Sequence, residues 1–341
     1  MTVPLHVAAF TQGLEVPSAR FRVRQLIEPL NHAGVTVREW PAVHGAYPPP
    51  GLAARLAWLP RAWRERRNAI DEAHRCAVAL FQREQISTLG GVELRWHKPA
   101  MLDVDDAIWL SQRWSSVDRI ARRIGLVICG NSFIAEHFAA LASVQILPTA
   151  VDATRYCPGA DTTADTPVMV WSGSASGMSY LQDIETALAR VLDAVPRARL
   201  RVVCNEVPRL PRLPVTRVDF VPWHPDTEVA SLQSATVGLM PMPDDPWTRG
   251  KCSFKMLTYM ACGLPVVVSP FGMNAEVLAQ GDVGIGARGQ RQWADALIGL
   301  LRDDTAARRL GQQGRKLAKT RYSTAVIAPQ LAALLRTRAA G

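Results

Sequence analysis

Three basic side chains stand close together in the second half of the chain, where a strand pattern gives way to a helix pattern. An apolar run ends at Met240, and a loop rich in proline and aspartate then leads to Arg249, Lys251 and Lys255. Lys251 and Lys255 are four residues apart, so they share one face if a helix begins there. A helix N-terminus presents free N–H groups and the positive end of the helix dipole. The sequence therefore predicts an anion site, with a solvated basic turn as the alternative.

Asp103, Asp105 and Asp106 form a second charged group, in the first half of the chain. Three close carboxylates can hold a divalent cation, orient a hydroxyl group, pair with Arg83 or Arg20, or cap the helix that follows. We favour an acceptor-side role, because the group lies in the opposite half of the chain from the anion site. Neither the cysteines nor the histidines show the spacing of a metal site. No metal site is predicted.

The elements that must position these residues alternate along the whole chain. Short apolar runs alternate with amphipathic stretches, which is typical of parallel βαβ units. The 341 residues exceed the roughly 250–300 at which a single core stops growing. We predict two doubly wound α/β domains, residues 1–150 and 151–325, with the site in the cleft between them. A C-terminal helix over 326–341 follows, for which packing back toward the N-terminal domain is one expectation.

The net charge of +9 suggests anionic partners, but its distribution narrows the choice. Residues 1–150 carry +4 and residues 151–341 carry +5, so no basic tail or one-sided domain exists. This even spread argues against a dedicated nucleic-acid-binding protein. The absence of a leader pattern and of a long apolar run predicts a cytoplasmic protein.

Residues 52–67 form a basic segment with leucines and tryptophans between its arginines. Such a segment is typical of a helix that lies on an anionic membrane surface. Pro60 is expected to divide it into two short pieces. Packing on the domain's own sheet, with a solvated basic face, is the alternative. A peripheral position at the inner face of the membrane therefore stays open.

The stretch Tyr259–Val267, which reads Tyr-Met-Ala-Cys-Gly-Leu-Pro-Val-Val, and the turn Gly272–Glu276 carry a family resemblance. They resemble the donor-binding region of glycosyltransferase family 4, the group 1 glycosyltransferases. Further matches to one subgroup extend over nearly the whole chain: Ser18–Arg22, Asp103–Trp109, Gly130–Ser132, Pro148–Asp152 and Trp171–Ser174.

This resemblance implies the GT-B fold, in which two Rossmann-like domains face each other across a cleft. It implies a retaining, metal-independent, hexosyltransferase-like enzyme that moves a sugar from a nucleotide-sugar donor to a glycan or lipid-linked acceptor. Synthesis of cell-surface polysaccharide or glycoconjugate is the expected context. No protein nucleophile and no cofactor is expected, because the nucleotide-sugar is a co-substrate.

The resemblance and the ends of the predicted strands together select candidate site residues. Asn205, Glu206 and Trp223 follow strand ends that suit contacts to a base or ribose. The resemblance adds the other donor-binding candidates, which are Gly173, Ser174, Gly250, Thr258, Tyr259, Asn274 and Glu276. The acceptor-side candidates are Arg20, Arg22, Arg83, Asp103, Asp105 and Asp106.

The chain departs from the family pattern at two places. The family's two glutamates, which hold the donor sugar and the ribose, are replaced by Gly250 and Thr258. The family's basic pyrophosphate clamp is replaced by the glycine and serine turn 173–177. We infer that Arg249, Lys251 and Lys255 take over the clamp and stabilise the leaving diphosphate. The alternative is a catalytically weakened GT-B protein that binds nucleotide or glycan without turnover.

Overall fold

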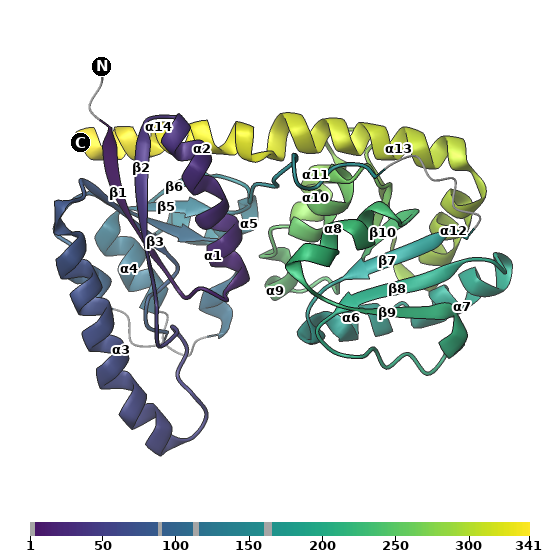
Figure 1. Ribbon diagram of the computed structural model, residues 1–341, viewed down its shortest axis with the longest axis horizontal. Coiled ribbons are helices and arrows are strands. Elements are labelled where there is room, and N and C mark those ends of the chain that lie inside the picture. The colour runs from purple at the N-terminus through teal and green to yellow at the C-terminus, as the bar shows by residue number, and fades with distance from the viewer. Residues whose placement is uncertain (1–3, 88–90, 112–115, 160–165) are drawn as a thin grey trace. The chain divides into compact units, whose positions relative to one another are not determined.

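The computed structural model describes residues 4–87, 91–111, 116–159 and 166–341, and these divide into two compact units (Figure 1). The first unit contains Met1–Ala150, Arg249–Cys252 and Thr324–Gly341. The second contains Val151–Thr248 and Ser253–Ser323. The short segment 249–252 thus groups with the first unit, although its neighbours on both sides belong to the second.

The first unit is built on a parallel sheet, with strand order β2-β1-β3-β4-β5-β6 among the described residues. Strands β3 and β4 are buried along their whole length, as expected of strands that helices cover on both faces. The order reverses between β1 and β3, and ligands of such sheets bind beyond the carboxyl ends of the strands at this point. The strands are β1 (Leu5–Thr11), β2 (Val35–Pro41), β3 (Val78–Gln82), β4 (Ala100–Val104), β5 (Leu126–Cys129) and β6 (Ser143–Ile146).

The end of the chain completes the core of the first unit. Ile327, Leu331 and Leu335 of α14 are buried in one cluster with Leu30 and Met101. The helices of this unit are α1 (Pro17–Arg22), α2 (Ile27–His32), α3 (Leu52–Glu72), α4 (Ser116–Ile124), α5 (Ser132–Ala139) and α14 (Thr324–Ala340). Short 3₁₀ turns lie at Arg24–Leu26, Ala73–Arg75, Glu93–Arg95 and Ile108–Ser111.

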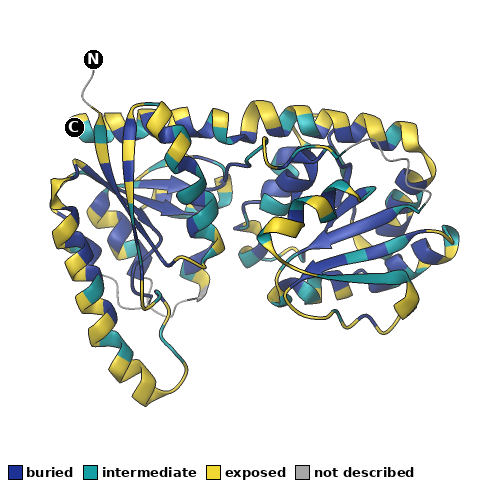
Figure 2. Ribbon diagram, in the orientation of Figure 1, coloured by how far each residue is buried: buried dark blue, intermediate teal, exposed yellow. Residues whose placement is uncertain are grey.

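Helix α3 runs without interruption through Pro60, so the expected division into two short pieces is wrong. Proline removes one backbone hydrogen bond to the preceding turn. Leu56 and Pro60 are both exposed, so water can satisfy the carbonyl that is left. The first turns of α3 are exposed on all sides, and only its second half packs, through Ala62, Arg66 and Ala69 (Figure 2).

The second unit repeats the architecture, with the parallel order β12-β11-β10-β7-β8-β9 among the described residues. Its order reverses between β7 and β10. The strands are β7 (Val168–Ser172), β8 (Arg199–Cys204), β9 (Val218–Pro222), β10 (Val237–Met240), β11 (Val266–Val268) and β12 (Ile285–Gly286). The prediction of two doubly wound parallel α/β sheets is confirmed.

The helices of the second unit cover both faces of its sheet, and Trp171, Leu188 and Trp293 fill its core. They are α6 (Met178–Gln182), α7 (Glu185–Ala194), α8 (Pro225–Gln233), α10 (Phe254–Ala261), α11 (Gly272–Leu278), α12 (Gly289–Arg302) and α13 (Asp304–Leu317). The turn α9 (Pro246–Arg249) leads into the segment 249–252, 3₁₀ turns lie at Ala175–Gly177 and Val215–Arg217, and a π turn spans Ala318–Tyr322. Within the described ranges, no helix combines the length and apolar character that crossing a membrane requires.

Candidate active site

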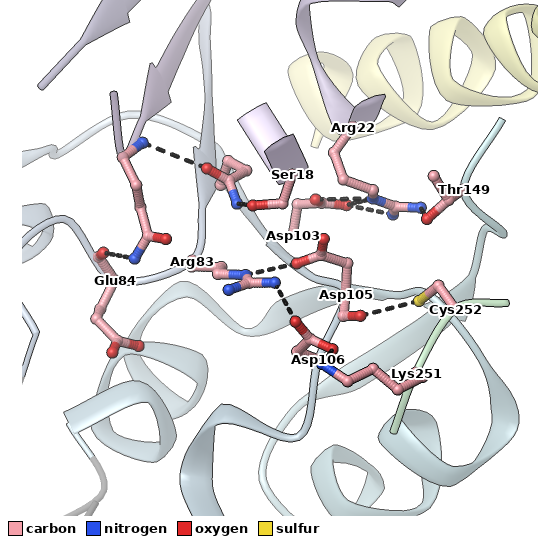
Figure 3. Close-up of polar contacts among 12 residues, drawn as sticks. Ser18, Arg22, Arg83, Glu84, Asp103, Asp105, Asp106, Thr149, Lys251 and Cys252 are labelled. Atoms are coloured by element: carbon pink, nitrogen blue, oxygen red, sulfur yellow. Dashed lines mark hydrogen bonds and ion pairs between the residues drawn. The ribbon is translucent and has the colours of Figure 1, made fainter. Parts of the chain in front are cut away.

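A buried ion pair joins α1 to the carboxyl end of β4 in the first unit. Arg22 reaches Asp103 with both its Nε, 3.0 Å from Oδ2, and its Nη2 (Figure 3). Its Nη1 donates to the carbonyl oxygen of Leu147 at 2.8 Å. Burial would lower the pKa of Arg22, but Asp103 outweighs this effect and raises that pKa. Burial raises the pKa of Asp103 in spite of Arg22, and the bonds of Arg22 tie three segments together.

A second network lies beside it, around Arg83. The Nε of Arg83 donates to Oδ1 of Asp105 at 2.5 Å, and Nη2 donates to Oδ2 of Asp106 at 2.7 Å. Lys251 Nζ lies 3.0 Å from Oδ1 of Asp106 (Figure 3). Burial alone would raise the pKa of Asp105, but Arg83 outweighs it and lowers that pKa. The three carboxylates, including Asp103, are thus engaged by three cations.

Arg83 itself holds a backbone conformation that is unusual for a residue with a side chain. Its φ is 58°, in the left-handed region, while its N–H donates to the carbonyl oxygen of Asp103 at 2.8 Å. Such strain persists only where the surroundings hold it, and it is concentrated at functional sites. The conformation directs the guanidinium toward Asp105 and Asp106.

The segment 249–252 packs tightly on the loop that carries these aspartates. A Cβ atom on Gly250 would lie 2.6 Å from the Cβ of Ala107 and 2.8 Å from its backbone nitrogen. Cys252 donates its thiol hydrogen to the carbonyl oxygen of Asp105, with Sγ 3.0 Å away. Asn131 caps α5 and also donates to the carbonyl oxygens of Arg249, at 3.1 Å, and Lys251, at 3.0 Å.

The two predicted lysines therefore have different surroundings. Helix α10 begins only at Phe254, after Ser253 with a left-handed φ of 51°, so Lys251 lies outside it and shares no helix face with Lys255. The physical reason is tertiary, because Gly250 and Cys252 are held by the aspartate loop. Lys251 is a partner of Asp106 in the first unit, whereas Lys255 belongs to the second.

Lys255 lies at the carboxyl end of β7. Its ammonium is 4.6 Å from the centroid of the Trp171 ring. A Cβ atom on Gly173 would lie 2.5 Å from that ammonium and 2.6 Å from the Trp171 ring. Glycine is therefore needed at 173 to let the lysine approach the backbone of the turn. Asn205 closes the same turn, because its Oδ1 accepts the N–H of Ala175 at 2.9 Å.

The remaining donor-binding candidates divide into buried and accessible residues. Tyr259 is buried and its hydroxyl accepts the N–H of Ser172 at 2.8 Å, while burial raises its pKa. The hydroxyl of Thr258 donates to the carbonyl oxygen of Lys255 at 2.8 Å. Asn274 is buried and accepts from the Ser253 hydroxyl at 2.7 Å. The accessible candidates are Ser174, Glu206, Trp223 and Glu276.

Among the acceptor-side candidates, Arg20 has its guanidinium 4.4 Å from the centroid of the Phe21 ring. Within the described ranges, no group of three or more histidine, cysteine, aspartate or glutamate side chains is arranged to hold a metal.

Residue-type reasoning did not select Trp171, Asn131 or Cys252 for the site. Asn131 carries a usable signal, because asparagine directly before an apolar helix pattern is a typical N-cap. Trp171 lies in a stretch that carries the resemblance, but its contact with Lys255, like that of Cys252 with Asp105, joins segments far apart in the sequence.

Comparison with known proteins places the chain. Residues 166–303 match the family Glycosyl transferases group 1. A D-inositol 3-phosphate glycosyltransferase of Corynebacterium glutamicum (strain R) is 26% identical in an alignment of 217 residues that covers 56% of this chain. The match spans about half, 51%, of that relative's length.

Solved structures extend the likeness in fold to the whole chain. Sucrose-phosphate synthase from Thermosynechococcus elongatus superimposes with a TM-score of 0.72, at 16% identity and 98% coverage of both chains. Anabaena HepE, solved with UDP and glucose, gives a TM-score of 0.73 at 14% identity, covering 97% of this chain and 99% of its own. Residues 166–303 are therefore similar to the group 1 glycosyltransferases, and the fold of the whole chain is GT-B.

Proposed function

We propose that this protein transfers a hexose from a nucleotide-sugar donor to a glycan or lipid-linked acceptor, with retention of anomeric configuration and without a metal. The family match of residues 166–303 supports the reaction class. HepE, of the same fold, was solved with UDP-glucose, which supports a nucleotide-sugar donor. Cell-surface polysaccharide or glycoconjugate synthesis is the context that we infer.

One observation carries the proposal, namely the position of Lys255 against the turn at Gly173. Ligands of doubly wound sheets bind beyond the carboxyl ends of the strands. A nucleoside diphosphate leaves with negative charge, and a cation that is already in position stabilises that charge as the glycosidic bond breaks. Trp171 and Gly173 position the Lys255 ammonium for this role. Lys251 lies against Asp106 of the first unit, whereas Lys255 lies at the Gly173 turn, so we assign the larger share of the clamp to Lys255.

The acceptor is proposed to bind at the aspartate network of the first unit. Its three carboxylates and three cations balance, so the network orients hydroxyl groups and does not attract a strong anion. Gln12 adds an acceptor, because its buried Oε1 has no hydrogen-bond partner among the described residues. Hydroxyl groups of a sugar suit this combination of carboxylate and amide oxygens.

Donor hydrolysis tests the proposal. The full chain is incubated with UDP-, GDP- and ADP-sugars, and release of nucleoside diphosphate is measured. We expect wild type to release nucleoside diphosphate from one donor class. Release should be at least 100-fold slower for Lys255→Ala and unchanged for Lys319→Ala, which alters an exposed lysine. The anomeric configuration of the transferred sugar, read by NMR, tests retention. Equal rates for Lys255→Ala and wild type would contradict the role of Lys255.

A second candidate function is binding of nucleotide or glycan without turnover. Gly250 has no space for the family's carboxylate, and the Thr258 hydroxyl is already bonded within α10. Nucleoside diphosphate binding together with no release from any donor would favour this candidate over an enzyme.

We also propose that α3 contacts an anionic membrane surface. Leu52, Leu56, Leu59 and Trp63 lie on one side of the helix, and Leu52 and Leu56 are 75% and 66% exposed. The segment packs on its own unit through Ala62 and Arg66, whereas Leu52 and Leu56 stay exposed. Arginines beside an exposed apolar stripe favour anionic lipid.

Leu52→Ser/Leu56→Ser is expected to abolish sedimentation with phosphatidylglycerol vesicles. Val215→Ser, which alters an exposed valine of the second unit, is expected to leave sedimentation unchanged. Failure of the wild type to sediment would contradict the contact.

A further inference from the structure

A groove of about 570 Å³ lies between strand β2 and helix α3 of the first unit, and no residue of the aspartate network lines it. Arg38 and Trp40 form its strand side. The helix side is one face of α3, because residues at these spacings recur along a single side of a helix. That face presents Arg61, Arg64, Asn68 and Glu72.

The acidic residues of the groove are largely neutralised by partners inside the protein. Glu39 accepts hydrogen bonds from Thr11, at 2.6 Å, and from the Nε of Arg24, at 2.9 Å. Glu65 pairs with Arg66 and accepts the N–H of Val43 at 3.3 Å. Two of the three glutamates that line the groove are therefore unavailable to compensate its other arginines.

Three arginines retain uncompensated charge. Arg38, Arg61 and Arg64 are exposed, and none forms an ion pair within the part of the chain that the structure describes. The Arg38 guanidinium lies over the Trp40 ring, 4.6 Å from its centroid, which limits the orientations of that side chain. Glu72 is the one remaining glutamate that lines the groove, and its single negative charge does not balance three arginines. The groove thus carries an excess of guanidinium groups, which bind phosphate in a bidentate manner.

The walls of the groove are held rigidly. Arg66 is buried and donates to the carbonyl oxygens of Trp40, at 3.0 Å, and Pro41, at 2.8 Å. Trp58 donates to the carbonyl oxygen of His44 at 2.8 Å, which fixes the loop before α3. A ligand therefore meets arginines on a preformed surface, and little ordering energy is lost on binding.

We propose that this groove binds the phosphate ester of a polyol. Arg38, Arg61 and Arg64 hold the phosphate, and the exposed Asn68 and Glu72 offer an amide and a carboxylate to the hydroxyl groups. The volume exceeds that of a bare phosphate ion and suits a ligand with an organic part. A soluble sugar phosphate and the glycerol phosphate headgroup of a lipid share this chemistry.

Titration of the full chain with glucose 6-phosphate, with glucose as the uncharged control, tests the site. We expect saturable binding of the phosphate ester alone, weakened at least tenfold in Arg61→Ala/Arg64→Ala. Arg67→Ala, an exposed neighbour on α3 that does not line the groove, is expected to stay within twofold of wild type. Lys255→Ala is also expected to retain this binding, which separates the groove from the donor site.

A second experiment measures binding to phosphatidylglycerol vesicles, with phosphatidylcholine vesicles as the control. Binding to the former alone would identify a lipid headgroup as the phosphate ester. The proposed site is supported if Arg61→Ala/Arg64→Ala weakens binding of glucose 6-phosphate or of phosphatidylglycerol vesicles while Arg67→Ala does not. Binding of neither probe, or equal losses in Arg61→Ala/Arg64→Ala and Arg67→Ala, would overturn it.

Discussion

At the scale of one residue, the surroundings of Gly250 leave no space for a larger side chain. Its α-carbon faces Ala107 so closely that even a Cβ atom would meet backbone atoms. Backbone atoms cannot give way as the end of a flexible side chain can. The close approach places Lys251 beside Asp106 and Cys252 beside Asp105. The glycine is therefore part of how the aspartate network is built.

Gly250→Ala is predicted to destabilise the protein by about 1–3 kcal/mol, the usual cost of forcing extra atoms into a packed site. Thermal unfolding followed by circular dichroism measures the effect. The matched control is Gly299→Ala, because a Cβ atom at this glycine within α12 meets nothing within 4 Å. That variant should be equally or more stable than wild type. Unfolding of Gly250→Ala at the wild-type temperature would contradict the close packing.

The buried carboxylate of Asp105 makes stability depend on acidity. Its pKa is lowered in the folded protein, so its contribution is present above the ordinary aspartate value of 3.8 and is lost as the pH falls through the folded value. Wild type should exceed Asp105→Asn in melting temperature at pH 7. We predict that this difference shrinks as the pH falls below about 4. A difference that stays constant from pH 7 to pH 3 would show that Asp105 is not stabilised as a carboxylate.

At the scale of elements, the buried Arg66 fixes helix α3 to the end of β2. Its guanidinium bonds to Trp40, Pro41 and Gln85, while the neighbouring Arg67 is exposed. The helix is thereby held at its second half, and its first half extends into solvent. This arrangement leaves both the leucine stripe and the arginine face accessible.

Arg66→Met is predicted to destabilise the first unit, because a buried acceptor left without a donor costs about 1–3 kcal/mol. The carbonyl oxygens of Trp40 and Pro41 both lose a donor in this variant. Arg67→Met, whose ion pair to Asp71 is exposed and 4.0 Å long, should change stability by less than about 0.5 kcal/mol. Urea unfolding of both variants measures the contrast, and equal effects would refute the anchoring role.

At the scale of the whole molecule, residues from early and late in the chain pack in one core of the first unit. Helix α14 lies at the C-terminus, yet Leu331 and Leu335 are buried with residues from the first strands and helices of the chain. The first unit is therefore complete only when the last residues are in place. Synthesis of residues 1–150 alone leaves an apolar face of this unit uncovered.

Leu331→Ala tests this dependence and is predicted to cost about 2–5 kcal/mol, as for other buried leucines. Gln330→Ala, one residue earlier and exposed on the same helix, should stay within about 0.5 kcal/mol of wild type. Thermal unfolding of the two variants gives the comparison. Equal stability of Leu331→Ala and wild type would mean that α14 adds little to the core.

The sequence predicts the elements better than the site. Stretches such as Ala77–Phe81 are continuous apolar runs, and this pattern is local, so two doubly wound sheets could be inferred. The separation of Lys251 from Lys255 could not be inferred from the sequence. It depends on the close contact of Gly250 with Ala107, which is far away in the sequence. Pro60 was misleading for a similar reason, since only the folded protein shows that its side of α3 faces water.

The central claim is that Lys255 holds the diphosphate of a nucleotide-sugar at the turn beside Gly173. Isothermal titration of wild type, Lys255→Ala and Lys319→Ala with UDP, GDP and ADP tests it most directly. We predict that one nucleotide binds wild type and Lys319→Ala alike, and binds Lys255→Ala at least tenfold more weakly, a loss of about 1.4 kcal/mol or more. Equal affinity of Lys255→Ala and wild type for that nucleotide would contradict the claim.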